Sequence, residues 1–404
     1  MFQRIKLSDD IKQYLIVTGN YWAFTLTDGA LRMLVVLYFH QLGYSPLNIA
    51  LLFLFYEVFG VITNLFGGYL GAKIGLNRTM NIGLAIQIIA LLLLTVPTDW
   101  LTVVYVMIAQ ALSGIAKDLN KMSAKSAIKM LVASGQEGTL FKWVAILTGS
   151  KNALKGFGFF IGGILLTLLS FKGAMLSMAV VLILVWCFSI YALKSDLGKA
   201  KTTPKFREIF SKSSAINSLS AARMFLFGAR DVWFVVALPV FLSQVFNWDH
   251  WTVGGFLAAW VIGYGIVQSC APALFNLTSG VSPAKEAVKW AAPLALVTFC
   301  IAIMLSFQWA IQISLIIGLL LFGVLFAINS SLHSYLIVSM ADADGVSLDV
   351  GFYYMANAMG RLIGTILSGW VYQYYGLTAC LFISSVFIIL AMLVSCRLPK
   401  TTLI

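Results

Sequence analysis

Charged residues are scarce in this sequence. Only 10% of its 404 residues are Asp, Glu, Lys or Arg, whereas 60% are hydrophobic. A soluble globular domain carries about a quarter of its residues as charges. No soluble fold of this length could bury so much apolar surface, so the composition predicts a chain whose solvent is the lipid bilayer.

Cysteine and histidine are also rare, with five and three residues. The cysteines fall in or at the ends of apolar stretches and show no CxxC or metal-ligand spacing, so we expect packing roles for them and no metal. The sequence also lacks a nucleophile triad and a phosphate-binding loop. We therefore expect neither enzyme activity nor a cofactor.

Long apolar runs are what the sequence does contain. A transmembrane helix needs about 20 apolar residues, and such runs recur along the whole chain. They are too long and too continuous for the strands of an outer-membrane barrel. They predict an all-α membrane protein with twelve transmembrane helices, near residues 13–40, 47–71, 79–97, 101–120, 141–169, 173–193, 215–243, 252–276, 288–306, 309–334, 351–372 and 377–396.

Basic residues outside these runs lie almost entirely on one side. Twenty Lys and Arg residues fall in the termini and the loops on the same side as the termini, against Lys172 alone in the opposite loops. Because loops rich in Lys and Arg stay in the cytoplasm, both termini are expected to be cytoplasmic. The same bias explains the net charge of +12 without a nucleic-acid partner. The polar start and the long first run argue against a cleaved signal peptide.

The longest polar stretch, residues 194–214, divides the chain into two halves of six predicted helices, at 1–193 and 215–404. A short repeat relates the halves. Gly29-Ala30-Leu31-Arg32 lies within the first predicted helix, and Gly228-Ala229-Arg230-Asp231 lies within the seventh. The division predicts two pseudo-symmetric bundles joined by a cytoplasmic linker.

Residues 68–78, GYLGAKIGLNR, resemble the signature loop of the major facilitator superfamily, roughly G-x-L-a-D-R-x-G-R-R. Lys73 and Arg78 occupy basic positions, and Ala72 replaces the usual Asp. The six-plus-six layout is also that of the superfamily. The resemblance implies a major facilitator fold, alternating access and a substrate site between the halves. It assigns a gating role to Lys73 and Arg78.

The fifth predicted helix contains Gly158-Phe159-Phe160-Ile161-Gly162-Gly163, which partly resembles the antiporter motif G-P-x-x-G-G of the same superfamily. The proline is missing. Close helix packing at Gly158 and Gly162 explains the pattern equally well.

Ionisable residues within the predicted helices set the substrate class. Each costs about 3 kcal/mol or more at the bilayer centre, so it must face a cavity or a partner. The basic ones outnumber the acids, which predicts a substrate with more than one negative charge. The basic residues are Arg32, Lys151, Lys155, Arg223, Arg230 and Arg361, with Lys117 a seventh if it is submerged, and the acids are Asp28, Glu57, Asp118 and Asp231.

Helical spacing groups several of these residues on common faces. Tyr21, Thr25, Asp28 and Arg32 share one face, which either lines a cavity or carries a structural Asp28–Arg32 ion pair. Arg223 also shares a face with Arg230, although snorkelling is an alternative for Arg223. A guanidinium group binds two oxygens of a phosphate or arsenate at once, in a bidentate contact.

The fifth predicted helix places Lys151 and Lys155 four residues apart, with Asn152 beside them. Like charges at this spacing repel each other, so we expect an anionic ligand there. Lys117, at the end of the fourth predicted helix, is a candidate for lining a cavity. For the lysines that follow it, Lys121 and Lys125, a role as membrane anchors is an equally good interpretation. Asn357, four residues before Arg361, completes this polar set.

The four acids are candidates for coupling or gating, whereas His333 is a candidate for substrate binding. His333 either titrates near neutrality or is a hydrogen-bonded structural residue. Glu57 is mid-helix without a basic helical neighbour, so it either carries a coupled proton or donates a hydrogen bond as a neutral acid. Asp28 and Asp231 lie beside arginines, and Asp118 lies beside Lys117. The energy source stays open between proton antiport and facilitated exit.

Three segments, residues 20–32, 113–123 and 149–156, resemble the ArsJ family of organoarsenical efflux permeases. The resemblance covers essentially the whole chain. It implies export of 1-arseno-3-phosphoglycerate across the bacterial inner membrane, and hence arsenate resistance. It also implies a functional partner, a glyceraldehyde-3-phosphate dehydrogenase that makes this ester. Alternatives are an exporter or antiporter of another phosphorylated or carboxylated anion, and, from another class, a channel or a membrane-embedded enzyme.

Overall fold

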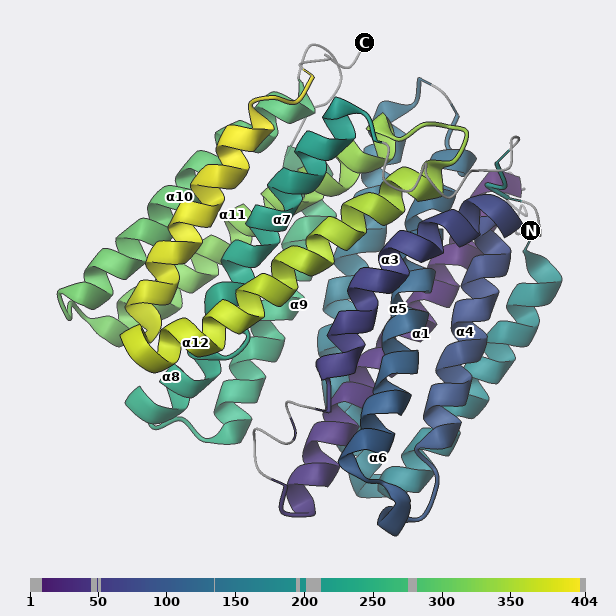
Figure 1. The fold of residues 1–404 in the computed structure, drawn as a ribbon, viewed down its shortest axis with the longest axis horizontal. Coiled ribbons are helices and arrows are strands. Elements are labelled where there is room, and N and C mark those ends of the chain that lie inside the picture. Colours follow the sequence, from purple (N-terminus) through teal and green to yellow (C-terminus); the bar gives the residue numbers. More distant parts are fainter. Residues whose placement is uncertain are drawn as a thin grey trace, which may run out of the picture. The chain divides into compact units, whose positions relative to one another are not determined.

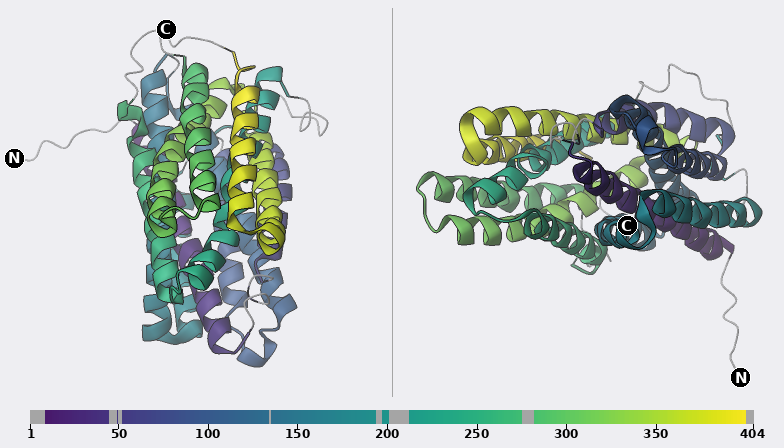
Figure 2. Two further views of the ribbon diagram at one scale, coloured as in Figure 1. Left: turned by 90° about the vertical axis from the view of Figure 1, so that its left-hand side faces the viewer. Right: turned by 90° about the horizontal axis from the view of Figure 1, so that it is seen from below.

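The computed structural model describes residues 9–44, 49, 52–133, 135–193, 197–200, 212–274 and 282–399. These residues form helices and connecting loops with no strand among them (Figures 1 and 2). The predicted all-α fold is therefore confirmed. Most of the predicted linker at 194–214 lies outside the described residues.

The helices follow the apolar runs. The first group consists of α1 (Asp9–Gln41), α3 (Leu54–Ile74), α4 (Leu76–Leu93), α5 (Val103–Leu131) and α6 (Glu137–Ala192), with a short 3-10 turn at Thr98–Trp100. The second group consists of α7 (Ser214–Phe234), α8 (Ala237–Val245), α9 (His250–Leu274), α10 (Pro283–Ser306), α11 (Ile311–Met340) and α12 (Val346–Ser395).

Two of these helices are too long for a single membrane crossing. α6 has 56 residues and α12 has 50, whereas about 20 residues suffice. Each contains one non-helical residue, Ser170 with φ 59° in α6 and Gly376 with φ 75° in α12. The helices are kinked at these points, and Figure 1 shows α12 changing direction between its two arms. Each is therefore a pair of helices.

Eight helical segments among the described residues are long and apolar enough to span a membrane, with α7 and α8 forming one of them. The second arms of α6 and α12, together with α3 and α5, supply four more helices. The described helices are thus compatible with the predicted twelve.

The predicted helix at 215–243 is interrupted, which the sequence analysis missed. α7 ends at Phe234 and α8 starts at Ala237. Pro239 explains the break, because its ring lacks an N–H and collides with the carbonyl four residues earlier, at Val235. At the break, the hydroxyl of Ser368 accepts hydrogen bonds from the backbone N–H groups of Val236 and Ala237, at 3.3 and 3.1 Å.

The helix α5 continues well beyond the predicted end at residue 120. Lys121 and Lys125 consequently lie on a helix and not in a loop. Lys125 is buried, with 2% of its surface exposed, so the membrane-anchor interpretation is wrong for this residue.

The chain divides into two compact units. Unit 1 comprises residues 1–143, 157–209 and 341–351, and unit 2 comprises residues 144–156, 210–340 and 352–404. Each unit has its own apolar core. The core of unit 1 includes Leu34, Leu84 and Val106, and that of unit 2 includes Trp233, Phe322 and Phe326.

The short repeat in the sequence marks the same kind of helix contact in each unit. In unit 1, a Cβ atom on Gly158 of α6 would lie 2.7 Å from the carbonyl oxygen of Leu26. A Cβ atom on Gly162 would lie 2.5 Å from the carbonyl oxygen of Ala30. In unit 2, a Cβ on Gly364 of α12 would lie 2.7 Å from the Gly228 carbonyl oxygen. Both Gly-Ala pairs therefore lie where two helix backbones nearly touch.

Replacing Gly360, one turn before Gly364, with valine is expected to destabilise unit 2. A Cβ atom there would lie 2.1 Å from the backbone oxygen of Met224, so α7 and α12 must separate. Overpacking of this kind costs about 1–3 kcal/mol or more. Gly369→Val in the same arm of α12 is the matched control, because no atom lies within 4 Å of its Cβ position. Equal melting temperatures of the two purified variants would contradict this account.

Candidate substrate site

The charged residues of unit 1 gather around Tyr56, a fully buried residue of α3. Its hydroxyl donates a hydrogen bond of 2.7 Å to Asp28 of α1. The guanidinium of Arg32 lies 4.0 Å from the centre of its ring, and the ammonium of Lys117 lies 3.9 Å from it. Tyr56 thus brings together two cations from α1 and α5 through cation–π contacts.

Arg32 pairs with an acid from another helix. Its Nη2 lies 2.9 Å from Glu57 Oε1, while Asp28 is engaged by Tyr56. The alternative of an Asp28–Arg32 ion pair within α1 is therefore wrong. Tyr21 and Thr25 of the same predicted face are buried, with 1% and 3% of their surfaces exposed.

Asp118 of α5 balances two lysines. This buried carboxylate lies 3.6 Å from Lys117 Nζ and 2.5 Å from Lys121 Nζ. Around Tyr56, three basic side chains therefore accompany three acidic ones. The basic residues are Arg32, Lys117 and Lys121, and the acids are Asp28, Glu57 and Asp118. This group is electrically balanced and requires no anion.

Unit 2 has a different charge balance. Asp231, at the end of α7, is fully buried and holds two arginines. Arg230 Nε donates to its Oδ1 at 2.6 Å, and Arg361 Nε of α12 donates to its Oδ2 at 3.0 Å. One carboxylate therefore faces two guanidinium groups.

Arg223 of α7 is the most unusual basic residue. It is buried, with 3% of its surface exposed. Its Nε donates to Asn357 Oδ1 at 3.0 Å, and its Nη1 donates to the carbonyl oxygen and the hydroxyl of Ser330 at 3.1 Å each. Its guanidinium lies 3.9 Å from the centre of the Phe227 ring. Within the described residues no carboxylate forms an ion pair with Arg223, and it does not snorkel.

Hydrogen-bond donors outnumber acceptors around Arg223. Besides Arg223, the Ser330 hydroxyl accepts from Tyr264 at 3.0 Å and from Gln268 at 3.1 Å. A hydroxyl oxygen offers two lone pairs, so three donors compete for it. The Gln268 side-chain oxygen is occupied by Asn152 of α6 at 2.7 Å. Such a site can satisfy its donors by taking up an anion.

His333 lies on α11 three residues after Ser330. It is buried, and its Nδ1 has no hydrogen-bond partner within the described part of the chain. Lys151 and Lys155 flank Asn152 on α6 and are half-buried. Of the predicted site residues, the structure joins Arg223, Asn357 and Asn152 in one hydrogen-bonded network, which runs through Ser330 and Gln268.

In the described helices of unit 2 that carry these groups, Asp231 is the one acid, and it contacts Arg230 and Arg361. The same helices carry five basic residues: Lys151, Lys155, Arg223, Arg230 and Arg361. The predicted excess of cationic side chains is thus concentrated in unit 2. The sequence analysis missed Tyr56, Tyr264 and Gln268. Polar residues inside apolar runs are the signal that could have found them.

A model of the major facilitator superfamily matches residues 17–281, which is more than half of the chain. The chain belongs to the major facilitator superfamily. It is accordingly a multi-pass membrane protein with the fold of a family of transporters, and this family is not one of enzymes.

Solved major facilitator structures share the fold. The human organic anion transporter MFSD10 (TETRAN) gives a TM-score of 0.76 at 14% identity, covering 96% of this chain and 100% of that chain. The proton:xylose symporter XylE gives 0.75 at 12% identity, covering 98% of each chain. The E. coli fucose:proton symporter FucP gives 0.73 at 11%, covering 98% of this chain and 100% of that one. No curated protein matches the sequence.

The signature-like loop of this major facilitator holds the start of the linker region. Gly75 separates α3 from α4 with φ 99°. The carbonyl oxygen of Ala72 accepts from the Ala200 N–H at 2.9 Å, and the Leu76 N–H donates to the Leu197 carbonyl oxygen at 2.8 Å. Ala72, which replaces the usual acid, is therefore a buried docking point for this segment.

The two basic residues of that loop stay at the surface. Lys73 and Arg78 are both exposed, and Lys73 Nζ lies 5.8 Å from the centre of the Tyr69 ring. Next to them, the Ser347 hydroxyl of α12 donates to the Gly68 carbonyl oxygen at 2.7 Å. The gating role of Lys73 and Arg78 stays a prediction.

Proposed function

We propose that this major facilitator exports a small, multiply charged anion by alternating access. The observation that supports it best is the environment of Arg223. A charge buried without a counterion is costly, and Arg223 is surrounded by neutral hydrogen-bonding groups and aromatic rings. An anionic substrate would neutralise it and accept from the crowded donors around Ser330.

The anion that we propose is 1-arseno-3-phosphoglycerate, supplied by a glyceraldehyde-3-phosphate dehydrogenase. Residues 20–32, 113–123 and 149–156 support this choice through their resemblance to organoarsenical efflux permeases. These segments include Arg32, Lys117 and Lys155. A substrate with a phosphate at one end and an arsenate at the other suits several separate basic groups. Export across the bacterial inner membrane, with both termini in the cytoplasm, would then confer arsenate resistance.

Everted membrane vesicles test the substrate directly. Arsenic is expected to accumulate inside them only when arsenate, the dehydrogenase and its triose phosphate substrate are all present. Accumulation of arsenate without the dehydrogenase would contradict the organoarsenical. Comparable accumulation of other phosphorylated or carboxylated anions would favour the second candidate, a general organic anion exporter. Comparing uptake with and without an imposed pH gradient distinguishes proton antiport from facilitated exit.

Alanine substitution of Arg32, Lys155 or Arg230 is expected to abolish arsenate resistance in cells that carry the dehydrogenase. Each change removes a cation that we assign to substrate binding, with a loss of at least about tenfold in affinity for a charge-assisted contact. The measurements are growth in arsenate and the amount of transporter in the membrane. Full resistance in all three variants would contradict the assignment.

The Arg32–Glu57 pair is our candidate for coupling. Its two side chains are partly exposed, at 21% and 28%, and Glu57 reaches Arg32 from a different helix. An anion that binds Arg32 would compete with Glu57 and release it to take up a proton. In this proposal, proton uptake by Glu57 accompanies substrate binding at Arg32.

A further inference from the structure

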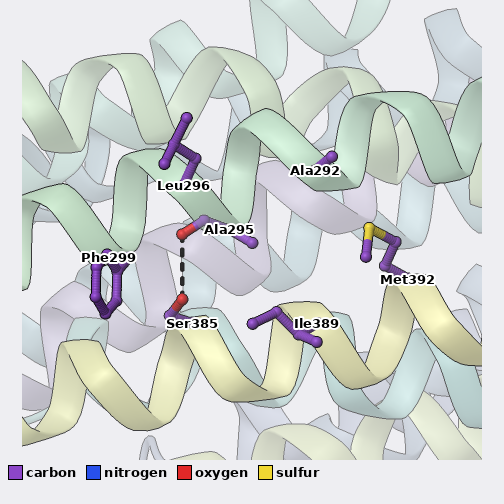
Figure 3. A pocket seen from close by; sticks show the side chains of 7 residues that line it. All are labelled: Ala292, Ala295, Leu296, Phe299, Ser385, Ile389 and Met392. Carbon is purple, nitrogen blue, oxygen red and sulfur yellow. Dashed lines mark hydrogen bonds between the residues drawn. The ribbon is translucent and has the colours of Figure 1, made fainter.

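A groove opens between α10 and the second arm of α12 in unit 2 (Figure 3). Its volume is about 300 Å³. Ala295 and Ser385 form its buried floor, and the Ser385 hydroxyl donates to the Ala295 carbonyl oxygen at 3.1 Å. Because this hydroxyl is engaged, the groove offers an apolar lining, made by Ala292, Ala295, Leu296, Phe299, Ser385, Ile389 and Met392.

Two alanines on α10 create the gap. Ala292 and Ala295 lie on one face, one turn apart, while the bulky residues around them project outward. Leu296, Phe299 and Ile389 are 62%, 45% and 41% exposed. On a membrane-spanning helix such exposure means contact with lipid. An unfilled gap forfeits dispersion contacts on one side, and an acyl chain is the apolar filler that a bilayer supplies.

Basic residues continue the same face of α10 toward its start. Lys285 and Lys289 precede Ala292 by seven and three residues, so they fall on the stripe that lines the groove, and both are exposed. Figure 3 places Ala292 near Met392 and Phe299 near Ser385, so the two helices run in opposite directions. The end of α12, with the exposed Arg397 just beyond it, therefore lies at the same end as the lysines.

One acid lies within this basic group. Glu286 Oε1 is 3.4 Å from Lys289 Nζ, and its Oε2 accepts from the Trp290 indole at 3.2 Å. Glu286 is only 18% exposed, whereas Lys289 is 72% exposed. Three cations against one shielded carboxylate leave an excess positive charge at the mouth of an apolar groove.

We propose that this groove binds an anionic phospholipid of the bilayer. One acyl chain lies against Ala292 and Ala295, and the phosphate of the headgroup meets Lys285, Lys289 and Arg397. Basic pockets between transmembrane helices bind anionic headgroups in this way. The positive-inside rule assigns this end of α10 to the cytoplasmic leaflet. The site therefore faces the anionic lipids of that leaflet. The site is separate from the basic cluster proposed for substrate.

Native mass spectrometry of the full chain, purified in mild detergent, tests the site. Phosphatidylglycerol and phosphatidylcholine with identical acyl chains are the probes. The wild type is expected to bind phosphatidylglycerol about tenfold more tightly, because each basic residue near the headgroup adds attraction. Replacing Lys285, Lys289 and Arg397 together with glutamine should remove this preference. Ala292→Phe fills the groove and should weaken binding of both lipids about tenfold or more.

Two controls keep the test specific. Lys142→Gln removes an exposed lysine at the start of α6, and Ile313→Phe enlarges an exposed side chain of α11. Both should bind the lipids like the wild type. All substituted residues are exposed, so melting temperatures without added lipid should not change. Equal affinity of the wild type for both lipids, an equal loss in Lys142→Gln, or unchanged binding in Ala292→Phe would overturn the proposal.

Discussion

Replacing Arg223 with methionine is expected to abolish transport while leaving the protein as stable as the wild type or more so. Methionine keeps much of the length of the side chain, so packing against Phe227 is retained. The guanidinium is buried without an ion-pair partner within the described residues, and removing an unpaired buried charge relieves a desolvation cost. Transport should fall by about 10- to 100-fold or more, since hydrogen bonds to charged groups contribute about 1.5–3 kcal/mol.

The combination of lost transport and retained stability is what identifies a binding residue. A structural arginine would show the opposite result, with a lower melting temperature. Arg32→Met is the comparison for stability alone, because Arg32 has a carboxylate partner at 2.9 Å. Its removal leaves Glu57 without that partner and should lower the melting temperature by a few degrees. Transport assays in everted vesicles and thermal melts of the purified variants provide both readouts. Wild-type transport by Arg223→Met, or a melting temperature below that of Arg32→Met, would contradict the assignment.

The fold was largely predictable because the bilayer imposes a simple rule. Within the described residues the long apolar runs became helices, with one break inside 215–243. The turns at Ser170 and Gly376 fall where breaks between spans were expected. Pro239 was a sequence signal for the break at Val235. The prediction missed it because the apolar run continues through this position. The extension of α5 was not predictable from hydropathy, since its last turns carry Lys121 and Lys125 and are stabilised by burial within unit 1.

The site was predictable in its residue types and less so in its pairings. Helical spacing tells which residues share a face, but it does not tell which helix that face meets. Glu57 had no basic neighbour along its own helix, yet Arg32 reaches it from α1. Arg361 likewise meets Asp231 across 130 residues of sequence. Partners of this kind depend on tertiary packing, so the sequence indicated an excess of cations without locating it in unit 2.

The distribution of charge suggests different tasks for the two groups. Around Tyr56 every cation has an acid nearby, so this group can change partners without a net change of charge. Around Ser330 and Asp231 the cations exceed the acids, so this group gains most from an anion. The balanced group suits coupling, and the unbalanced group suits capture of substrate.

Asp231→Asn is expected to destabilise unit 2 strongly, because it leaves Arg230 and Arg361 without their shared carboxylate. Breaking a buried pair by removing one partner costs about 3–5 kcal/mol. Melting of the purified variant measures the loss. Adding Arg361→Met to Asp231→Asn removes one of the stranded charges and should restore part of the stability, whereas Arg361→Met alone leaves the Arg230–Asp231 pair intact and should have a smaller effect.

The same variant links stability to anion binding. With Asp231 neutralised, the cluster carries one more uncompensated positive charge, so inorganic phosphate should raise the melting temperature of Asp231→Asn more than that of the wild type. A ligand that binds only the folded state stabilises it by mass action. Sodium chloride at the same ionic strength controls for screening. If Asp231→Asn melts like the wild type, or if phosphate stabilises both equally, the basic residues of unit 2 do not act as an anion site governed by this carboxylate.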